Sequence, residues 1–528
     1  MPRLVEALNL KGNPFEHYVA ESEPNIDQYA VKPPYFEAIE ARATNRSSFI
    51  LFGDRGAGKS ATRLTVFKEI WARKAKGERV PLVVNLVDFS VLVKGQQLRD
   101  LTEETLIKEV AFVVIESILT WLSSLEDDER DVYVGALNDD ESRICYQLLR
   151  DHYLSRPEGR RERSVHDALL LFNQAFAAKS RLWIERRWEP IARLIGRLGD
   201  FLARKYVSAD VDVSGDVVSV LRRDHEEDFD SVLLLRRLVG LAAIFGFSGI
   251  VLLVDKVDET AATNNSADQT AKLVYPILSR VQLMEVPDFS WIFFLWQRVK
   301  SFFETDDYRV RLDKVGHATV SWDDEFFILM LDRRVRFFSD DKLDFAGLIS
   351  PDLDIQELQS ELVRISMRSP REMIRLLDVI IREHDVLNVD QDKLCLLNHD
   401  SIQSGLDKYV KDVISTVYGE RLLAQIFRLN RAIFTNNDVQ YTFRVGAQSA
   451  RRRIQSWENA GIIKLTGTRA AEGAQGGKPA NEYTITDSRV ERVMRRQLIY
   501  YDNGTLPDDD GVLAREDQEV DDRDWQPV

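Results

Sequence analysis

The stretch that decides the fold is Gly53-Asp54-Arg55-Gly56-Ala57-Gly58-Lys59-Ser60. It follows a compact apolar run, Ser48 to Phe52, which reads as a buried strand. It precedes Ala61 to Ala75, where apolar residues recur three and four positions apart and predict an amphipathic helix. A strand, a glycine-rich loop and a helix in this order are the context in which the pattern G-x-x-x-x-G-K-[ST] binds phosphate groups.

The chemistry of this loop suits a nucleoside triphosphate. The glycines at 53, 56 and 58 let backbone N–H groups turn toward an anion with no Cβ in the way. The following helix points its positive end at the same anion. We expect Lys59 to reach the β- and γ-phosphates and the Ser60 hydroxyl to ligate Mg²⁺. The predicted cofactors are ATP and Mg²⁺, bound by the eight loop residues and Ala61.

A second apolar run, Ile250 to Val254, ends in an acidic cluster. A buried strand that ends this way places a carboxylate beside the phosphate loop, so we expect Asp255 to hold Mg²⁺. The next position is Lys256, so a water-activating carboxylate would have to be Asp258 or Glu259. We expect ATP hydrolysis; if neither carboxylate reaches the attacking water, the chain is a slow ATP-binding switch.

Further runs, Leu82–Leu86 and Trp291–Trp296, also read as buried strands, and helical spacing at 230–245 and 267–284 separates them. Strands that alternate with helices predict an α/β fold with a parallel sheet covered on both faces. The expected division of the chain is a segment flanking the nucleotide site at 1–46, a P-loop core at 47–300 with a helical insertion at about 95–228, a helical lid at 301–390, a linker at 391–419, a winged helix at 420–498 and an acidic disordered tail at 499–528.

The winged helix is predicted from three helical stretches and two short strands. The helices are expected at 420–429, 436–441 and 448–460, the last stopping at Gly461, and the strands at 462–465 and 483–486 flank a long loop. Residues 421–496 contain 14 Lys and Arg against 6 Asp and Glu, a balance of +8. Residues 502–528 contain 10 Asp and Glu against 2 Arg, a balance of −8.

A basic winged helix suits double-stranded DNA. Its third helix would enter the major groove while the wing follows the backbone. The candidate DNA-binding residues are Arg451, Arg452 and Arg453 on that helix, with Arg469 and Lys478 in the wing. Winged helices also bind proteins, and the acidic tail either lies on the basic surface or is a solvated, solubilising segment.

Composition narrows the class of protein. A chain of 528 residues is too long for one hydrophobic core. Its net charge of −15 argues against a protein that coats nucleic acid over its whole surface. Two cysteines cannot form a disulfide framework or a Cys-rich zinc site. Without a secretory signal pattern at the first residues or a membrane-length apolar run, we expect a cytoplasmic protein without a membrane partner.

Two further motifs complete a family pattern. The apolar run 291–296 ends in Gln297, and Ser369-Pro370-Arg371 opens an amphipathic stretch. With the motifs above, the chain resembles AAA+ ATPases of the origin-recognition (ORC) type and bacterial ORC-like and STAND-like P-loop ATPases, over about residues 30–95 and 229–500. The resemblance implies that Gln297 contacts the γ-phosphate as sensor 1 and that Arg371 meets the phosphates from the lid as sensor 2. Arg368 stands where the family has glycine.

Two function hypotheses follow. The first is an ATP-hydrolysing ATPase that couples nucleotide state to DNA binding or oligomerisation, with itself or an effector protein as a further partner. The alternative is an ATP-driven signalling or assembly switch whose winged helix and insertion bind protein partners. The sequence does not choose between replication, mobile elements and defence against phage as the biological setting.

Overall fold

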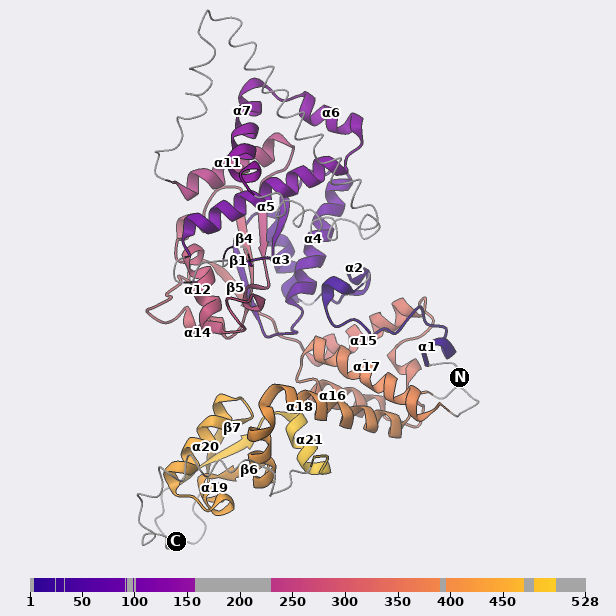
Figure 1. Ribbon diagram of the computed structural model, residues 1–528. Helices are drawn as coiled ribbons and strands as arrows, with labels where there is room; N and C mark the ends of the chain where they lie inside the picture. Colours follow the sequence, from indigo (N-terminus) through magenta and orange to yellow (C-terminus); the bar gives the residue numbers. More distant parts are fainter. Residues whose placement is uncertain are drawn as a thin grey trace, which may run out of the picture. The chain divides into compact units, whose positions relative to one another are not determined.

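The structure is a computed structural model that describes residues 4–23, 25–32, 34–90, 92, 98, 101–156, 229–389, 396–469 and 479–499 (Figure 1). The chain forms two compact units. Residues 19–326 make one, which we call the α/β unit. Residues 1–18 and 327–528 make the other, which we call the helical unit.

The α/β unit is built on a parallel sheet with short connecting helices. Its described elements are η1 (Ala20–Ser22), α2 (Ile26–Tyr29), α3 (Pro34–Thr44), β1 (Phe49–Gly53), α4 (Lys59–Ala75), β2 (Leu82–Leu86), α5 (Glu103–Ser124), α6 (Asp127–Gly135), α7 (Asp139–Leu148), η3 (Leu149–Leu154), α11 (Ser231–Ile244), β3 (Ile250–Val254), η5 (Val257–Glu259), α12 (Ala267–Leu278), α13 (Val281–Met284), β4 (Phe289–Trp296), α14 (Val299–Phe302) and β5 (Gly316–Thr319).

The strand order of this sheet is β2-β3-β4-β1-β5, and every pairing is parallel. β4 therefore lies between β1, which leads into the glycine loop, and β3, which ends before Asp255. In the register Gly53 is opposite Trp296. Because parallel strands end at the same edge of a sheet, the loop, the acidic cluster and Gln297 all follow strands at one edge. The predicted parallel α/β fold is confirmed.

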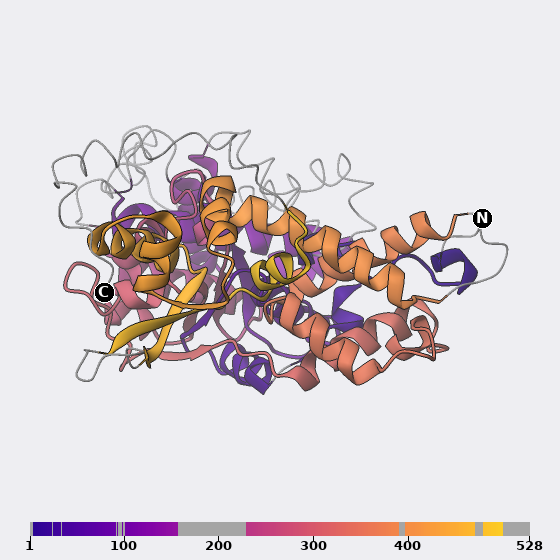
Figure 2. The ribbon, with the colours of Figure 1, turned by 90° about the horizontal axis from the view of Figure 1, so that it is seen from below.

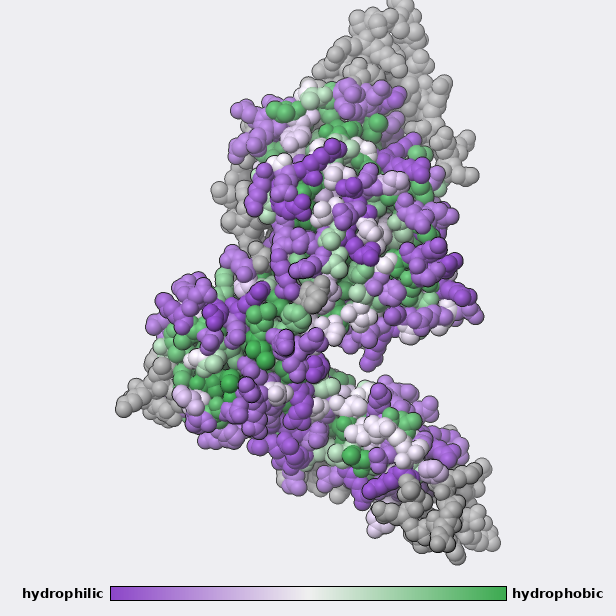
Figure 3. Space-filling view, turned by 180° about the vertical axis from the view of Figure 1, so that it is seen from behind, coloured by the Kyte–Doolittle hydropathy of each residue, from purple (hydrophilic) through white to green (hydrophobic). Residues whose placement is uncertain are grey.

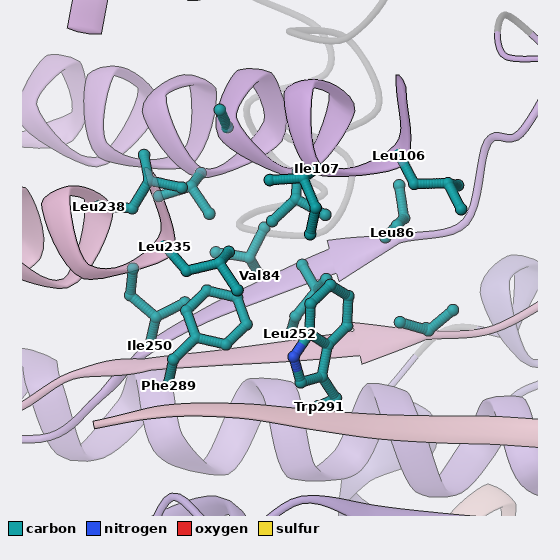
Figure 4. Close-up of a cluster of buried hydrophobic side chains, with 14 of the residues drawn as sticks. Val84, Leu86, Leu106, Ile107, Leu235, Leu238, Ile250, Leu252, Phe289 and Trp291 are labelled. Atoms are coloured by element: carbon teal, nitrogen blue, oxygen red, sulfur yellow. The ribbon is translucent and has the colours of Figure 1, made fainter. Parts of the chain in front are cut away.

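β1, β2, β3 and β4 are buried on both faces, so their side chains alternate between two hydrophobic clusters. On one face, side chains of α5 and α11 pack over β2, β3 and β4 (Figure 4). The labelled members of that cluster are Val84, Leu86, Leu106, Ile107, Leu235, Leu238, Ile250, Leu252, Phe289 and Trp291. On the other face, α3 and α4 pack against the alternate strand residues.

Two predicted boundaries in this unit differ from the structure. The helical insertion was expected to begin at about residue 95. The first helix after that point, α5, instead belongs to the core of the unit, because its apolar side chains are buried almost all round. Residues 157–228 lie outside the described residues. The lid expected from 301 starts too early, because β5 extends the sheet beside β1 and the unit continues to 326.

The helical unit contains the helices predicted to form a lid and the C-terminal module. Its described elements are α1 (Leu4–Ala7), α15 (Asp324–Phe338), η6 (Phe345–Leu348), α16 (Ile355–Ile365), α17 (Pro370–Leu387), α18 (His399–Leu429), β6 (Ile433–Thr435), α19 (Asn436–Phe443), α20 (Ala447–Asn459), β7 (Ile463–Arg469), β8 (Ala480–Ile485) and α21 (Ser488–Arg496). The first residues of the chain belong here, since Phe15 is fully buried and Asn13 donates to Asp378 of α17 over 2.7 Å.

The predicted winged helix is confirmed. Its sheet has the order β6-β8-β7, is antiparallel, and β7 and β8 form the ribbon of the wing (Figure 2). The first helix of the module is the last part of α18, and Gly419 interrupts that helix with φ 71° and ψ 155°. The predicted boundary at 420 coincides with this kink.

The predicted linker at 391–419 is wrong in its second half. Residues 399–418 form the first part of α18, which buries Ile402, Leu406 and Tyr409 and packs along α17. The apolar spacing that buries these residues is helical, so the segment is a packed element of the unit and not a connector.

The face of the molecule in Figure 3 is mainly hydrophilic over the α/β unit, and its hydrophobic areas are small and scattered. No helix within the described ranges is both long and apolar enough to cross a membrane.

Candidate nucleotide site

The glycine loop connects β1 to α4 and has the backbone that its sequence demands. Gly56 and Gly58 adopt φ of 78° and 87°, a region that L side chains avoid. A Cβ on Gly53 would lie 3.1 Å from Cγ2 of Val320. The indole Nε1 of Trp322 donates to the carbonyl of Ala57 over 2.9 Å. These contacts fix the turn from β1 into α4.

The two residues that carry the phosphate chemistry begin α4. The Lys59 ammonium donates to the carbonyls of Gly53 and Asp54 at 2.8 and 2.9 Å, so it lies over the mouth of the loop. The Ser60 hydroxyl donates to Oδ2 of Asp255 over 2.7 Å. The structure thus brings together the predicted Mg²⁺ ligands, which are almost two hundred residues apart in the sequence.

Asp255 is buried, with 2% of its surface exposed, and has a cationic partner that sequence reasoning missed. Nε of Arg63, one turn into α4, donates to the same Oδ2 at 3.0 Å. The other guanidinium nitrogens donate to Asn85 at the end of β2 and to Glu21 of η1, both over 2.7 Å. The only sequence signal for this contact was the position of Arg63 four residues after Lys59, on the same helix face.

Glu21 also binds Lys256, with 2.9 Å between Oε1 and Nζ. Lys256 has φ of 59°, so the chain turns sharply after Asp255 and directs this side chain toward η1. Burial raises the pKa of the Glu21 carboxyl, but the charges of Arg63 and Lys256 outweigh burial and hold that pKa below its ordinary value. Asp255, Arg63, Glu21 and Lys256 therefore form a row of alternating charges, which we call the charge chain.

The two candidate carboxylates for water activation lie in different surroundings. Asp258 is buried, and its Oδ2 accepts a hydrogen bond from Nε of Arg55, in the loop itself, over 3.0 Å. Arg55 in turn lies over the ring of Trp296 at 4.4 Å. Glu259 is exposed. Of the pair left open by the sequence, only Asp258 is held against the phosphate loop.

The sensor residues predicted from the family resemblance fall in different units. Gln297 follows β4 between the two motif strands, its backbone N–H donates to the carbonyl of Gly53 over 3.1 Å, and its side chain is exposed. Arg371 lies in the first turn of α17, in the helical unit, after an N-cap by Ser369 and a proline at the first position. Arg368 has φ of 55°, which gives a physical reason for glycine at that position in the family pattern.

The arrangement fits a magnesium nucleotide. A hydroxyl and a buried carboxylate, both hard oxygen ligands, meet at the edge of the sheet beside a loop whose Gly56 and Gly58 have positive φ. Lys59 supplies the cation for the phosphates. Ser60 and Asp255 are the residues that would hold the ion.

The predicted DNA-binding arginines differ in their exposure to solvent. Arg451 and Arg452 are exposed on α20, and Arg469 is exposed at the end of β7. Arg453 is buried and stacks on Phe443 at 4.9 Å, because its position on the helix faces the same side as Ile454 and Trp457. Arg453 is therefore a packing residue in this structure. Lys478 lies outside the described residues.

The basic balance of this module is partly internal. Arg489 binds Asp487, and Arg492 and Arg496 bind Asp407 of α18. Asp407 lies outside the counted range 421–496, so its pairs with Arg492 and Arg496 make the unpaired charge of the module smaller than +8 suggests.

No protein-family model matches the chain, and no curated protein matches its sequence. Among solved structures, the chain is similar to the Aeropyrum pernix ORC1 protein in complex with DNA, with 12% identity and a TM-score of 0.37 over 91% of this chain and 96% of that one. It is also similar to the Aeropyrum pernix ORC2 protein in its ADPNP-ADP complexes, with 9% identity and a TM-score of 0.41 over 90% and 99%. The ADP form of ORC2 gives 10% identity and a TM-score of 0.39 over 91% and 99%. We base the function on the residues of this chain.

Proposed function

We propose that this chain binds ATP with Mg²⁺, hydrolyses it, and binds duplex DNA through its winged helix. The observation that carries the proposal is the meeting of Lys59, Ser60 and Asp255 beside a glycine loop of the required backbone conformation. A lysine and a hydroxyl at the start of one helix, with a buried carboxylate after another strand of the same sheet, are the groups that bind a phosphate chain and its Mg²⁺.

Binding would use the loop amides and Lys59 for the phosphates, with Ser60 and Asp255 for the ion. Mg²⁺ supplies positive charge that offsets the charge developing on the phosphate oxygens. Lys59 already lies over the loop carbonyls, so it can transfer from these to phosphate oxygens without a change in the backbone. Gln297 and Arg371 remain the proposed γ-phosphate sensors.

For hydrolysis we assign the water-activating role to Asp258. A water oxygen attacks the γ-phosphorus while the bond to the β–γ bridging oxygen breaks, and the water proton passes to the Asp258 carboxylate and then to phosphate. Arg55 holds that carboxylate against the loop, whereas Glu259 faces solvent.

Release of labelled phosphate from ATP tests this assignment. Asp258→Asn should reduce turnover by about 100-fold or more, in the range of a lost general base, with ATP affinity unchanged. Glu259→Gln is the matched control and should turn over at the wild-type rate. Loss of turnover in Glu259→Gln alone would show that the exposed carboxylate is the base.

The DNA part of the proposal depends on the face of α20. The exposed residues of this helix include Gln448, Arg451, Arg452, Gln455 and Asn459, with Glu458 as the exposed carboxylate. Amides and guanidinium groups are the side chains that read base edges and bind phosphates in the major groove.

Filter binding of a duplex at about 50 and 200 mM salt tests it, since phosphate contacts weaken steeply over that range. Arg451→Ala with Arg452→Ala should weaken binding and lower the salt slope by about 1 for each phosphate contact removed. Arg336→Ala, an exposed arginine of α15, should leave both unchanged. Absence of duplex binding by the wild type at the lower salt would favour a winged helix that binds protein.

A further inference from the structure

The charge chain contains three residues that the proposed chemistry does not use: Arg63, Glu21 and Lys256. Lys256 directly follows the carboxylate proposed to hold Mg²⁺. It places a side-chain ammonium next to the position where a divalent cation is proposed to bind. Some feature of the site must therefore control where this ammonium lies.

The Glu21 carboxylate binds this ammonium. Its Oε1 lies 2.9 Å from Nζ of Lys256 and 2.7 Å from a terminal nitrogen of Arg63. Arg63 is 1% exposed at its side chain and also binds Asp255 at 3.0 Å. Oε1 of Glu21 thus binds both Arg63, which contacts Asp255, and Lys256, which follows Asp255 in the sequence.

The charges of this row sum to zero as long as Glu21 is ionised. Asp255 and Glu21 carry one negative charge each, and Arg63 and Lys256 carry one positive charge each. Without the Glu21 charge, two cations would share the single carboxylate Asp255 and leave a net charge of +1 beside the ion site. Arg63 and Asp255 are buried, so the unbalanced positive charge of Arg63 would repel Mg²⁺ with little screening by solvent, and the ion would bind less tightly.

The segment that presents Glu21 is itself packed in place. Glu23, two residues on, is 4% exposed and accepts a hydrogen bond from the Tyr29 hydroxyl over 2.8 Å. Ile26 is buried as well, and η1 and α2 both pack on α4. Glu21 is therefore held by a fixed element, as a positioning residue requires.

We propose that Glu21 is a positioning residue for Mg²⁺: it neutralises Arg63 and draws Lys256 away from the carboxylate that holds the ion. The inference rests on the proposed function, because it concerns the same site. Glu21 touches neither the ion nor the nucleotide, and it sets how much Mg²⁺ the site needs to retain a nucleotide.

The test is a MgCl₂ titration of the binding of a fluorescent ATP analogue to the full chain, with a matched measurement in EDTA. Glu21→Gln should raise the half-saturating Mg²⁺ concentration about tenfold, the effect of about 1.4 kcal/mol, and leave the affinity in EDTA within about twofold of the wild type. Glu21→Asp keeps the charge and should stay near the wild type. Glu78→Gln removes a carboxylate that pairs with Arg73 at the far end of α4 and should change neither value.

A double variant separates charge balance from a purely structural role. Glu21→Gln with Lys256→Gln restores a neutral row, so it should return the half-saturating Mg²⁺ concentration toward the wild-type value. If the double variant is no better than Glu21→Gln, or if Glu21→Gln weakens binding equally with and without Mg²⁺, the inference is wrong. If the wild type binds no analogue in either buffer, the proposed function itself fails, and the two failures are thereby distinct.

Discussion

Two buried arginines, one in each unit, show how similar ionic contacts can have different roles. Arg63 of the α/β unit and Arg492 of the helical unit are each 1% exposed at the side chain. Arg63 binds Asp255, Asn85 and Glu21. Arg492 binds Asp407, Glu361 and Gln403, all within 2.8 Å. In each case a guanidinium is bound by two carboxylates and one side-chain amide.

The two clusters differ in whether one of their carboxylates is proposed to bind a further cation. Asp407 is also bound by Arg496, so the cluster around Arg492 contains two carboxylates and two arginines and is neutral within the protein. Asp255 accepts the Ser60 hydroxyl and lies beside the phosphate loop, where a further cation is proposed to bind. The cluster of α21 therefore serves packing, whereas the cluster of α4 is proposed to serve a ligand. Stability measurements with and without Mg²⁺ can distinguish the two.

The largest effect is expected from Arg492→Met. It removes the cation and leaves the carboxylates of Asp407 and Glu361 without it, which should lower the free energy of unfolding by about 3 to 5 kcal/mol. The measurement is urea unfolding followed by circular dichroism. Arg364→Met is the matched control: its pair with Glu491 spans 3.6 Å and is about two-fifths exposed on both sides, so its loss should cost less than about 1 kcal/mol. Equal losses would contradict a packing role for the cluster.

Arg63→Met should have a somewhat smaller effect, about 2 to 4 kcal/mol, because Glu21 is partly exposed and solvent screens it. Its distinguishing feature is the response to Mg²⁺. A divalent cation can replace the lost positive charge beside Asp255, so millimolar Mg²⁺ should restore part of the stability, as any ligand of the native state does. Arg492→Met should show no such recovery. The comparison breaks down if both variants respond alike.

A pH-dependent effect of intermediate size is expected at the base of α21. Burial raises the pKa of the Asp487 carboxyl, but the Arg489 guanidinium and the Tyr418 hydroxyl outweigh burial and hold it below its ordinary value. A depressed pKa contributes stability that is present above the ordinary pKa of aspartate and is lost as pH falls through the folded value. Asp487→Asn should therefore flatten the loss of stability between about pH 5 and 3, near the ordinary Asp value of about 3.9. If Asp487→Asn loses stability with falling pH as steeply as the wild type, Asp487 does not contribute to this pH dependence.

The smallest effects concern the arginines of α20. Arg453→Ala removes a buried stem and a contact with the Phe443 ring, and should cost about 1 to 2 kcal/mol. Arg451→Ala alters an exposed position and should stay within about 0.5 kcal/mol. Thermal unfolding measures the stability of both variants. A larger loss of stability for Arg451→Ala than for Arg453→Ala would contradict the orientation of α20.

Local motifs made much of this molecule predictable. The loop at 53–60 and the run that ends at Asp255 each combine an apolar strand with a polar end, and both lie where the sequence placed them. The third helix of the winged helix was expected at 448–460 and spans 447–459. In each of these segments the residues that decide the structure are neighbours in the chain.

The missed features depend on contacts between distant residues. Glu21, Arg63 and Asp255 meet only because η1, α4 and β3 pack together, and none of the three positions marks the contact by itself. β5 is a four-residue edge strand of alternating exposure, with too little apolar character to stand out. Arg453 lies on the buried face of α20, but its ring partner, Phe443, belongs to the preceding helix α19. Sequence patterns give the faces of single elements, whereas these features depend on how the elements are assembled.

The most direct test of the central claim is calorimetric titration of ATP with Mg²⁺ into the wild type and into Lys59→Ala. A lysine that meets the phosphates contributes about 2 kcal/mol or more, so the variant should bind at least about 30-fold more weakly than the wild type, which should show saturable binding at one site. Equal binding by the two proteins, or no binding by the wild type, would contradict the account.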